Sequence, residues 1–403
     1  MSGKYDIGLE EALAKTFACL NPLEPVAIPV EKACGLVAAE DALALVDCPS
    51  ETSSLKDGFG VLSSQLIGAS DNNPIRLRII GTQTAGNDTG LKLSKGEAIK
   101  LMTGAKIPVG CDAVIASEFT REENSSVLCF RDAAPGRNIL KKGTDVTKDR
   151  FLLPSGKIIT PAMTGLLAAG GIERIPVYPL PRIAILAIGD EVIAPGRKLN
   201  PGQLYASNLV TLVSWLKIFG LKTRTEVIKD REEDIESSIT DLLSQADLLL
   251  TSGGAWKSER DLTTKVLTRM GGNKIFHRVR IGPGKAVALV IFKGKTIFCL
   301  PGGPPSNEMA FLQIALPAIL HLSAHKPYPF KIETAHLARR VGGDINWTQF
   351  VRVKLEKVKE KLIAHPLKME SRIGEQAVTD GIVKVPEGVK YLEEGVDIPV
   401  QVF

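Results

Sequence analysis

The spacing of apolar residues changes twice along this chain. Residues 9–20 place apolar side chains at helical spacing, and Asn21-Pro22 ends the predicted helix. Near the other end, residues 350–358 and 398–403 alternate apolar and polar positions with a period of two. That alternation is typical of strands with one buried face, so a β-domain is expected to close the chain.

Between these ends, two further patterns appear. From about residue 51 to residue 142, short apolar runs are separated by Gly, Asn and Asp turns, which predicts a small β-rich domain. A helix is predicted over residues 161–169, followed by a proline-punctuated linker over 176–181. From there, apolar strands alternate with helices over 207–219 and 232–246, which predicts a parallel α/β sheet.

The chain of 403 residues is longer than one core usually organises, so several domains are expected. We predict a central three-layer α/β domain with a mostly parallel sheet, an N-terminal extended and helical domain into which a β-rich domain is inserted, and a C-terminal β-barrel-like domain. The expected boundaries are 181–326 for the α/β domain, 1–50 with 143–180 for the discontinuous N-terminal domain, 51–142 for the inserted domain and 327–403 for the C-terminal domain.

Three segments of the α/β domain place glycine directly after an apolar strand and predict a helix after that turn. They are residues 183–191, 247–254 and 296–306. Turns of this kind leave backbone N–H groups free to hold anions. In an open parallel sheet, ligands bind beyond the carboxyl ends of the strands, so these turns locate the expected chemistry.

Acidic and basic residues lie at or near these turns. Asp190 and Glu191 either cap a helix or hold Mg²⁺ together with substrate phosphate oxygens, and Asp261 is placed to complete such a cation site. Lys285, on the turn 282–285, is either a solvated surface lysine or a point charge for an oxyanion. The residues alone leave both pairs of alternatives open.

Composition narrows the class of function. The net charge of +5 is spread along the chain, which favours small anionic ligands over nucleic acid. No apolar run is long enough for a signal peptide or a membrane span, and no C-x-x-C pair occurs among the six cysteines, so we expect a cytoplasmic protein without membrane partners. No hydrolase, P-loop or dinucleotide motif occurs in a suitable strand–turn–helix context.

Taken in order, the motifs resemble those of the molybdopterin molybdenumtransferase family of molybdenum-cofactor biosynthesis. The resemblance covers nearly the whole chain. It rests on Leu36–Asp41, Ser54–Gly60, Met102–Ala105, Gly136–Ile139, Gly143–Val146, Gly189–Glu191, Ser207-Asn208, Ser252–Gly254 with Asp261, Pro283–Lys285 and Leu300–Pro304.

The resemblance implies an enzyme that inserts molybdate into adenylylated molybdopterin and releases AMP with the help of Mg²⁺. It suggests a set of catalytic residues: Asp57, Thr103, Asp145, Glu191, Asp230 and Asp261. Of these, Glu191 and Asp261 would hold Mg²⁺. The implied substrate-binding residues are Gly253, Gly254, Lys285, Pro301, Gly302, Pro304, Ser306, Arg352 and Ser371, among which Lys285, Arg352 and Ser371 would handle the oxyanion.

The resemblance also implies a homodimer, in which residues of two subunits meet, and a transient contact with the adenylyltransferase of the same pathway. This chain departs from the family pattern at several turns. Lys56 precedes Asp57 where methionine is usual, Ala255-Trp256 follows the Gly-Gly turn where small residues are usual, and Gly303 replaces the asparagine of Pro-Gly-Asn-Pro. We expect retained activity with altered ligand contacts.

Two alternatives stay open. A non-catalytic molybdopterin-binding scaffold or carrier would explain the altered loops, although the acidic residues are kept. The adenylyltransferase itself resembles residues 181–325 alone and lacks the N-terminal motifs, which counts against it. Tungstate in place of molybdate is equally compatible with these residues, because the two oxyanions have nearly the same size and charge.

Overall fold

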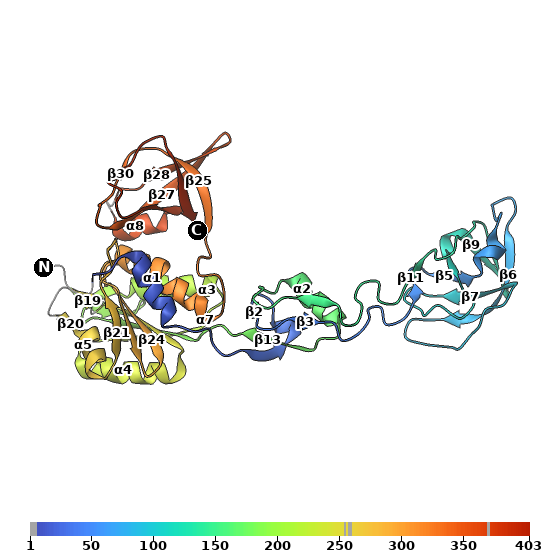
Figure 1. Cartoon of the computed structure of the whole chain (residues 1–403), viewed down its shortest axis with the longest axis horizontal. Helices are drawn as coiled ribbons and strands as arrows, with labels where there is room; N and C mark the ends of the chain where they lie inside the picture. Colours follow the sequence, from blue (N-terminus) through green and yellow to red (C-terminus); the bar gives the residue numbers. More distant parts are fainter. Residues whose placement is uncertain (1–5, 254, 257–259, 369–370) are drawn as a thin grey trace. The chain divides into compact units, whose positions relative to one another are not determined.

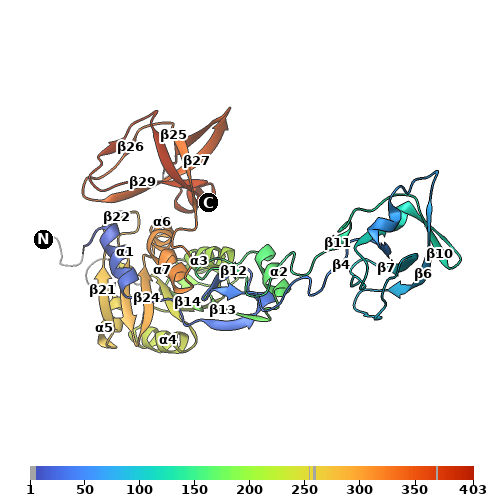
Figure 2. The same cartoon turned by 45° about the vertical axis from the view of Figure 1, so that its right-hand side comes forward.

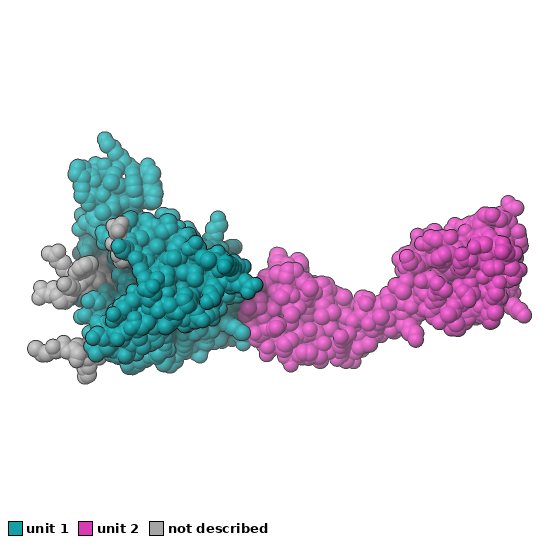
Figure 3. Space-filling model, turned by 90° about the horizontal axis from the view of Figure 1, so that it is seen from above, with its two compact units in different colours: residues 1–25, 178–403 teal, residues 26–177 magenta. Residues whose placement is uncertain are grey.

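The computed structural model describes residues 6–253, 255–256, 260–368 and 371–403. It divides the chain into two compact units, coloured separately in Figure 3. Unit 1 contains residues 1–25 and 178–403, and unit 2 contains residues 26–177. Each unit is described by itself below.

Unit 1 is built around a six-stranded sheet (Figure 1). In spatial order its strands are β17 (Thr223–Ile228), β14 (Ile183–Ile188), β18 (Leu248–Ser252), β24 (Lys295–Leu300), β23 (Ala288–Phe292) and β21 (Asn273–His277). The first four strands are parallel, and the last two pair antiparallel to them. The expected α/β domain with a mostly parallel sheet is confirmed.

Alternate residues of the central strands feed two separate cores, because successive strand side chains point to opposite faces. Ile183 and Ile185 of β14 join the core that contains α3 (Ser207–Ile218), α6 (Pro304–Ala310) and α7 (Leu316–Leu322). Ala184 and Leu186 join the core that contains α4 (Glu232–Gln245) and α5 (Leu262–Arg269). Helices therefore cover both faces, as Figure 1 shows, and the expected three layers are present.

The first helix, α1 (Leu9–Ala18), belongs to this same unit. Its residues Leu9, Ala12 and Leu13 are buried in the core on the α3 side of the sheet. The sequence grouped residues 1–50 with the N-terminal domain, whereas α1 packs against α7 and β21 of the α/β unit. The exact four-part division of the chain stays a prediction.

The C-terminal part of unit 1 is a closed barrel, whose strands β25, β27 and β29 are labelled in Figure 2. Five strands close on themselves because β27 pairs with β28 on one side and β29 on the other. In spatial order they are β27 (Thr348–Val358), β28 (Lys361–Pro366), β25 (Lys331–Leu337), β31 (Asp397–Val402) and β29 (Gly381–Val385). The short strand β22 (Ile281–Gly282) pairs with β27, β26 (Val341–Gly342) pairs with β30 (Tyr391–Leu392), and α8 (Arg372–Ala377) precedes β29. The predicted C-terminal β-domain is confirmed.

Unit 2 contains a six-stranded and a three-stranded sheet. The larger sheet has the order β8 (Ala113–Ala116), β5 (Gly58–Val61), β7 (Glu97–Leu101), β6 (Ile75–Gln83), β10 (Ser126–Cys129) and β9 (Thr120–Glu123). The smaller sheet joins β1 (Val26–Pro29), β13 (Arg174–Tyr178) and β2 (Val37–Ala38), and α2 (Pro161–Ala169) packs on its core. Two-stranded pairs complete the unit: β3 (Ala42–Leu43) with β12 (Phe151–Leu153), and β4 (Ser53–Ser54) with β11 (Ile139–Leu140).

One boundary expected from the sequence needs correction. The predicted linker over 176–181 begins too early, because Pro176 lies in β13 and pairs with Ala27 of β1. The residue before a proline is biased towards extended backbone, so a proline-containing segment is compatible with a strand as well as with a linker.

Candidate functional site

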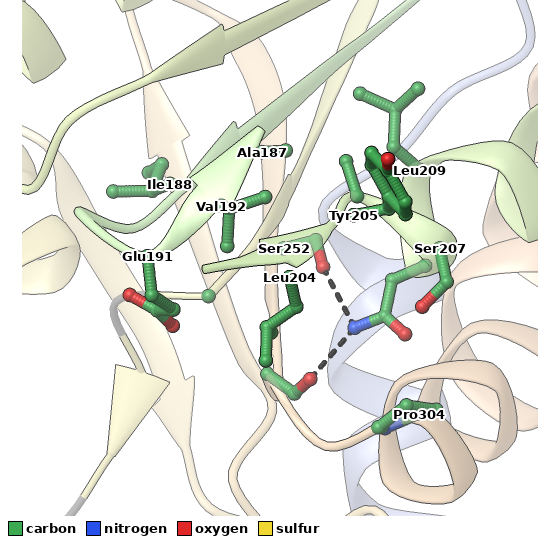
Figure 4. Close-up of a pocket in the computed structure, with 14 residues that line it drawn as sticks. Ala187, Ile188, Glu191, Val192, Leu204, Tyr205, Ser207, Leu209, Ser252 and Pro304 are labelled. Carbon is green, nitrogen blue, oxygen red and sulfur yellow. Dashed lines mark hydrogen bonds between the residues drawn. The ribbon is translucent and has the colours of Figure 1, made fainter. Parts of the chain in front are cut away.

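A cavity lies beyond the carboxyl ends of β14, β18 and β24, where the three glycine turns were expected. We call it the turn pocket. It consists of two adjoining cavities, the larger about 670 Å³ in volume. Both are lined by Ile188, Glu191, Leu204, Tyr205, Ser207, Gly253, Gly302 and Pro304 (Figure 4). Its position is the ligand site of open parallel sheets, so the structure places the pocket where the sequence predicted chemistry.

The turns differ in how they continue. Only the third leads directly into a helix, since α6 begins at Pro304. After β14 the chain forms β15 (Val192–Ile193) and β16 (Leu204–Tyr205) before α3 begins, and after β18 come β19 (Ala255–Trp256) and β20 (Arg260–Asp261) before α5. The expectation that each turn opens a helix is therefore wrong for two of them. No described helix begins at Asp190 or Glu191, so the helix-cap alternative does not apply to them, and their role as cation ligands stays a prediction.

Negative charge gathers at one end of the turn pocket. Glu191, Asp230 and Gly189 all line the larger cavity. Partial burial raises the pKa of Asp230, and the nearby charges of Asp190 and Glu191 raise that pKa further. Carboxylates that repel one another in this way bind a cation favourably, because the cation removes the repulsion. Arg372 of α8 lines the same cavity and supplies a positive group.

The second and third turns are connected through asparagine side chains. The Asn208 amide nitrogen donates to Ser252 Oγ over 3.2 Å and to the Gly302 carbonyl oxygen over 2.7 Å (dashed lines in Figure 4). The Asn307 amide nitrogen donates to Ser252 Oγ over 3.0 Å and to the Pro301 carbonyl oxygen over 2.8 Å. The turns after β18 and β24 are thus held at a fixed separation.

Three residues expected to handle an oxyanion do not meet in the turn pocket. Arg352 is buried and donates to Glu308 over 2.6 Å. Lys285 is exposed, with its ammonium 5.7 Å from the ring centre of Trp347. Ser371 precedes α8, where its hydroxyl accepts from the Gly374 N–H. None of the three is among the described residues that line the pocket.

The remaining expected residues of the third turn lie at the pocket or beside it. Gly302 and Pro304 line it, and Ser306 is half-buried in the first turn of α6. Pro301 is buried, and its carbonyl oxygen accepts from the Asn307 amide nitrogen. Gly253 adopts a φ of +97°, and a Cβ there would stand 2.1 Å from the Ile188 carbonyl oxygen, so only glycine fits that turn.

Asp57, Thr103 and Asp145 lie in unit 2. One Asp57 oxygen accepts from the Thr103 backbone N–H over 2.6 Å and from the Thr103 hydroxyl over 2.8 Å. The bond from the backbone N–H and, after it, the bond from the hydroxyl lower the pKa of Asp57 below its ordinary value. Asp145 is exposed, and its backbone N–H donates to the Cys48 carbonyl oxygen. The structure thus joins Asp57 and Thr103 directly, and no hydrogen bond among the described residues joins either of them to Asp145.

Two expected residues cannot be placed. Gly254 and the side chain of Asp261 lie outside the described part of the chain. Among the residues that are described, no three His, Cys, Asp or Glu side chains gather closely enough to hold a metal ion by themselves. The carboxylates at the pocket are nevertheless the oxygen donors that Mg²⁺ prefers, and Mg²⁺ usually needs only one or two of them beside substrate phosphates.

Sequence reasoning missed Glu308 and Arg372. Glu308 directly precedes the apolar residues 309–312 and is itself buried in α6, where a charged side chain is normally paired. Its carboxylate accepts from Trp215 Nε1 over 2.7 Å, from Arg352 and from Gln376 Nε2 over 2.8 Å. Arg372 follows the predicted Ser371, but only the fold brings α8 to the turn pocket.

Comparison with known proteins agrees with this architecture. Family models match in chain order: the "MoeA N-terminal region (domain I and II)" over residues 7–171, the "Probable molybdopterin binding domain" over 184–321, and the "MoeA C-terminal region (domain IV)" over 334–403. The molybdopterin molybdenumtransferase of Haemophilus influenzae is 32% identical over 83% of this chain and 83% of its own length. The chain belongs to the MoeA family.

Other MoeA relatives extend the match to almost the whole length. Molybdopterin molybdenumtransferase 2 of Mycobacterium tuberculosis is 29% identical over 94% of this chain and 96% of its own. The crystal structure of the molybdopterin biosynthesis MoeA protein from Pyrococcus horikosii superposes with a TM-score of 0.82 at 32% identity, covering 98% of this chain and 99% of that one. Among the described residues, no helix combines the length and apolar character that crossing a bilayer requires.

Proposed function

We propose that this MoeA family member is a molybdopterin molybdenumtransferase, an enzyme that inserts molybdate into adenylylated molybdopterin and releases AMP with the help of Mg²⁺. The names of its relatives support the transfer reaction, and the family models span all parts of the chain. That span also disfavours the single-domain adenylyltransferase as an alternative. We further propose that the protein acts as a cytoplasmic homodimer, in transient contact with that adenylyltransferase.

The observation that carries the proposal is the turn pocket itself. It combines carboxylates at one end with the hydrogen-bonding groups of two glycine turns and the start of α3. A substrate with a nucleotide phosphate and a bound cation needs both kinds of group: donors for the phosphate oxygens and oxygen ligands for the metal.

Mg²⁺ bound in this pocket would polarise the phosphate link that is cleaved. Glu191 is the proposed ligand on the protein, with Asp261 as the second and Asp230 beside them. The raised pKa of Asp230 has burial as its largest cause, and the charges of Asp190 and Glu191 add to it; a cation would offset that added negative charge, which is compatible with this assignment. Protons and Mg²⁺ should therefore compete at this site.

The oxyanion is assigned to Lys285, Arg352 and Ser371, with Asp57, Thr103 and Asp145 as further active-site residues. For Arg352 the assignment requires a change of partner, because its guanidinium is bonded to Glu308. Molybdate, a dianion, competes with a carboxylate for the same donors. Gly253, Gly254, Pro301, Gly302, Pro304 and Ser306 are proposed to shape the pterin and nucleotide contacts.

The deciding experiment is release of AMP from adenylylated molybdopterin by the purified protein, with and without molybdate and Mg²⁺. Release that requires both, with molybdenum in the pterin product, supports the transferase. Tight binding of the substrate without release of AMP supports the alternative, a non-catalytic scaffold or carrier. The altered loops at Lys56, Ala255-Trp256 and Gly303 are the reason for that alternative.

Replacing Glu191 by glutamine tests the metal assignment. The substitution keeps the shape of the side chain and removes its charge, so we expect Mg²⁺-dependent turnover to be lost while the melting temperature is preserved. Glu233→Gln, on the exposed first turn of α4, is the matched control. Unchanged metal-dependent turnover in the Glu191 variant would exclude that residue as a ligand.

A further inference from the structure

Two asparagine side chains hold one serine hydroxyl at the wall of the turn pocket. Ser252 ends β18 and is only 5% exposed, and Asn307 in α6 is 1% exposed. Ser252 Oγ accepts from Asn208 and from Asn307 over 3.2 and 3.0 Å. We call these three residues the asparagine clamp. Asn208 and Ser252 both line the pocket.

The clamp fixes the direction of the Ser252 proton. Each amide nitrogen also donates to a backbone carbonyl oxygen, of Gly302 or of Pro301, and a carbonyl oxygen can only accept. This second bond assigns the nitrogen and oxygen ends of both amides. Ser252 Oγ must therefore accept at both of its lone pairs, and its own proton is left to donate. The described residues offer no acceptor for that proton.

The start of α3 adds donors at the same wall. The helix has twelve residues, and its N-cap residue Ala206 makes no side-chain cap. The backbone N–H groups in the first turn of a helix have no acceptor within the helix and need one from a cap or a ligand. The N–H groups of residues 207–209 have no such acceptor within the described chain. Ser207, Asn208 and Leu209 all line the pocket. A buried hydroxyl donor beside free helix N–H groups is suited to an oxyanion.

We propose that Ser252, together with the first turn of α3, binds a phosphate oxygen of the nucleotide-bearing substrate, and that Asn208 and Asn307 are positioning residues that act through Ser252. The proposal rests on the proposed function, since it is that function which brings a nucleotide phosphate to the pocket. Ser252 contacts the ligand directly, and the asparagines set the direction of its hydroxyl.

Asn307 also accounts for a departure noted in the sequence. Gly303 stands where the family pattern has asparagine, so one amide is absent from the third turn. A Cβ at Gly303 would meet nothing within 4 Å, which shows that the local space there is open. Asn307, one helical turn further on, supplies an amide to the same turn through the Pro301 carbonyl oxygen.

The test uses the full chain and measures AMP binding by calorimetry, with adenosine as the second ligand. Ser252→Ala should weaken AMP binding by about 10- to 100-fold, which is the loss of affinity expected when a hydrogen bond to a charged group is removed. Adenosine has no phosphate, so its binding should be unchanged. Asn307→Asp keeps the shape of the side chain but cannot donate from it. Its carboxylate would accept the Ser252 proton instead, so AMP binding should fall by a similar factor.

The double variant separates positioning from other effects. If Asn307 acts through Ser252, Asn307→Asp should cause no further loss of AMP affinity in the Ser252→Ala background. An additional loss there would indicate charge repulsion and contradict the positioning role. Asn273→Asp, the same chemical change at an exposed site on edge strand β21, is the control and should bind AMP normally.

The remaining outcomes are equally decisive. Equal loss of AMP and adenosine binding in Ser252→Ala would place the hydroxyl on the nucleoside and overturn the phosphate assignment. Absence of AMP binding by the unmodified protein would overturn it as well. AMP release from the adenylylated substrate, measured in parallel, tests the transferase activity independently. If the unmodified protein binds AMP but releases none from the substrate, the proposed function is rejected. The predicted losses of AMP binding in the variants would still support the phosphate site.

Discussion

Asp57 receives two hydrogen bonds from one residue, and this arrangement can be tested directly. Thr103→Val removes the hydroxyl donor but keeps the backbone N–H, which is the larger cause of the lowered pKa. We expect the Asp57 pKa to rise part of the way towards its ordinary value, as measured by NMR titration of the carboxyl carbon. Thr103→Ser keeps both donors and should leave the pKa unchanged.

The sign of the associated pH dependence follows from linkage. Because folding lowers the Asp57 pKa, its contribution to stability is complete above the unfolded pKa and is lost as the pH falls through the lower folded value. Thr103→Val should move that loss to higher pH. An Asp57 titration that is identical in the two proteins would show that the hydroxyl bond has no effect on the carboxylate in solution.

Glu308 offers a second test at the scale of single residues. Its carboxylate is 8% exposed and offsets the buried charge of Arg352, which is 6% exposed. Glu308→Ala leaves that guanidinium buried without its partner, so we expect the free energy of unfolding to fall by about 3–5 kcal/mol. Urea unfolding followed by tryptophan fluorescence measures this, because Trp215 donates to the same carboxylate.

An exposed ion pair provides the comparison. Glu232 in α4 pairs with Arg269 in α5, and both side chains are about half exposed. Glu232→Ala should therefore cost less than about 1 kcal/mol. Equal effects of the two substitutions would mean that burial does not set the strength of the Glu308 interaction.

At the scale of elements, the turn after β18 depends on Gly253. Its positive φ and the closeness of the Ile188 carbonyl oxygen leave no room for a Cβ. Gly253→Ala should push the β18 turn away from β14, lower the melting temperature and abolish AMP binding in the turn pocket. Gly303→Ala, in the neighbouring turn, has open space and a φ of −72°. It should leave the melting temperature unchanged; a harmless Gly253→Ala would contradict this account of the turn.

Local patterns were sufficient to predict most elements but not the contacts between them. The helices over 161–169 and 207–218 lie where the sequence predicted them, because the signals for a helix are local to the segment that forms it. The ion pair between Arg352 and Glu308 joins residues 44 positions apart, and the hydrogen bond from Asn208 to Gly302 joins residues 94 positions apart. No periodicity encodes such contacts, so the expected oxyanion role of Arg352 was inferred without its partner.

For the whole molecule, the proposed homodimer predicts a species of twice the chain mass of 43.3 kDa in sedimentation equilibrium. The resemblance implies that residues of two subunits act together, which gives a sharper test with Asp57→Asn and Glu191→Gln. Each variant alone should be inactive in AMP release. The two variants are then unfolded together and refolded to give mixed dimers. If each site takes Asp57 from one subunit and Glu191 from the other, one site of a mixed dimer carries both substitutions and the other carries neither. Mixed dimers should therefore regain activity. Two inactive proteins that stay inactive as verified mixed dimers would show instead that each active site is built from a single chain.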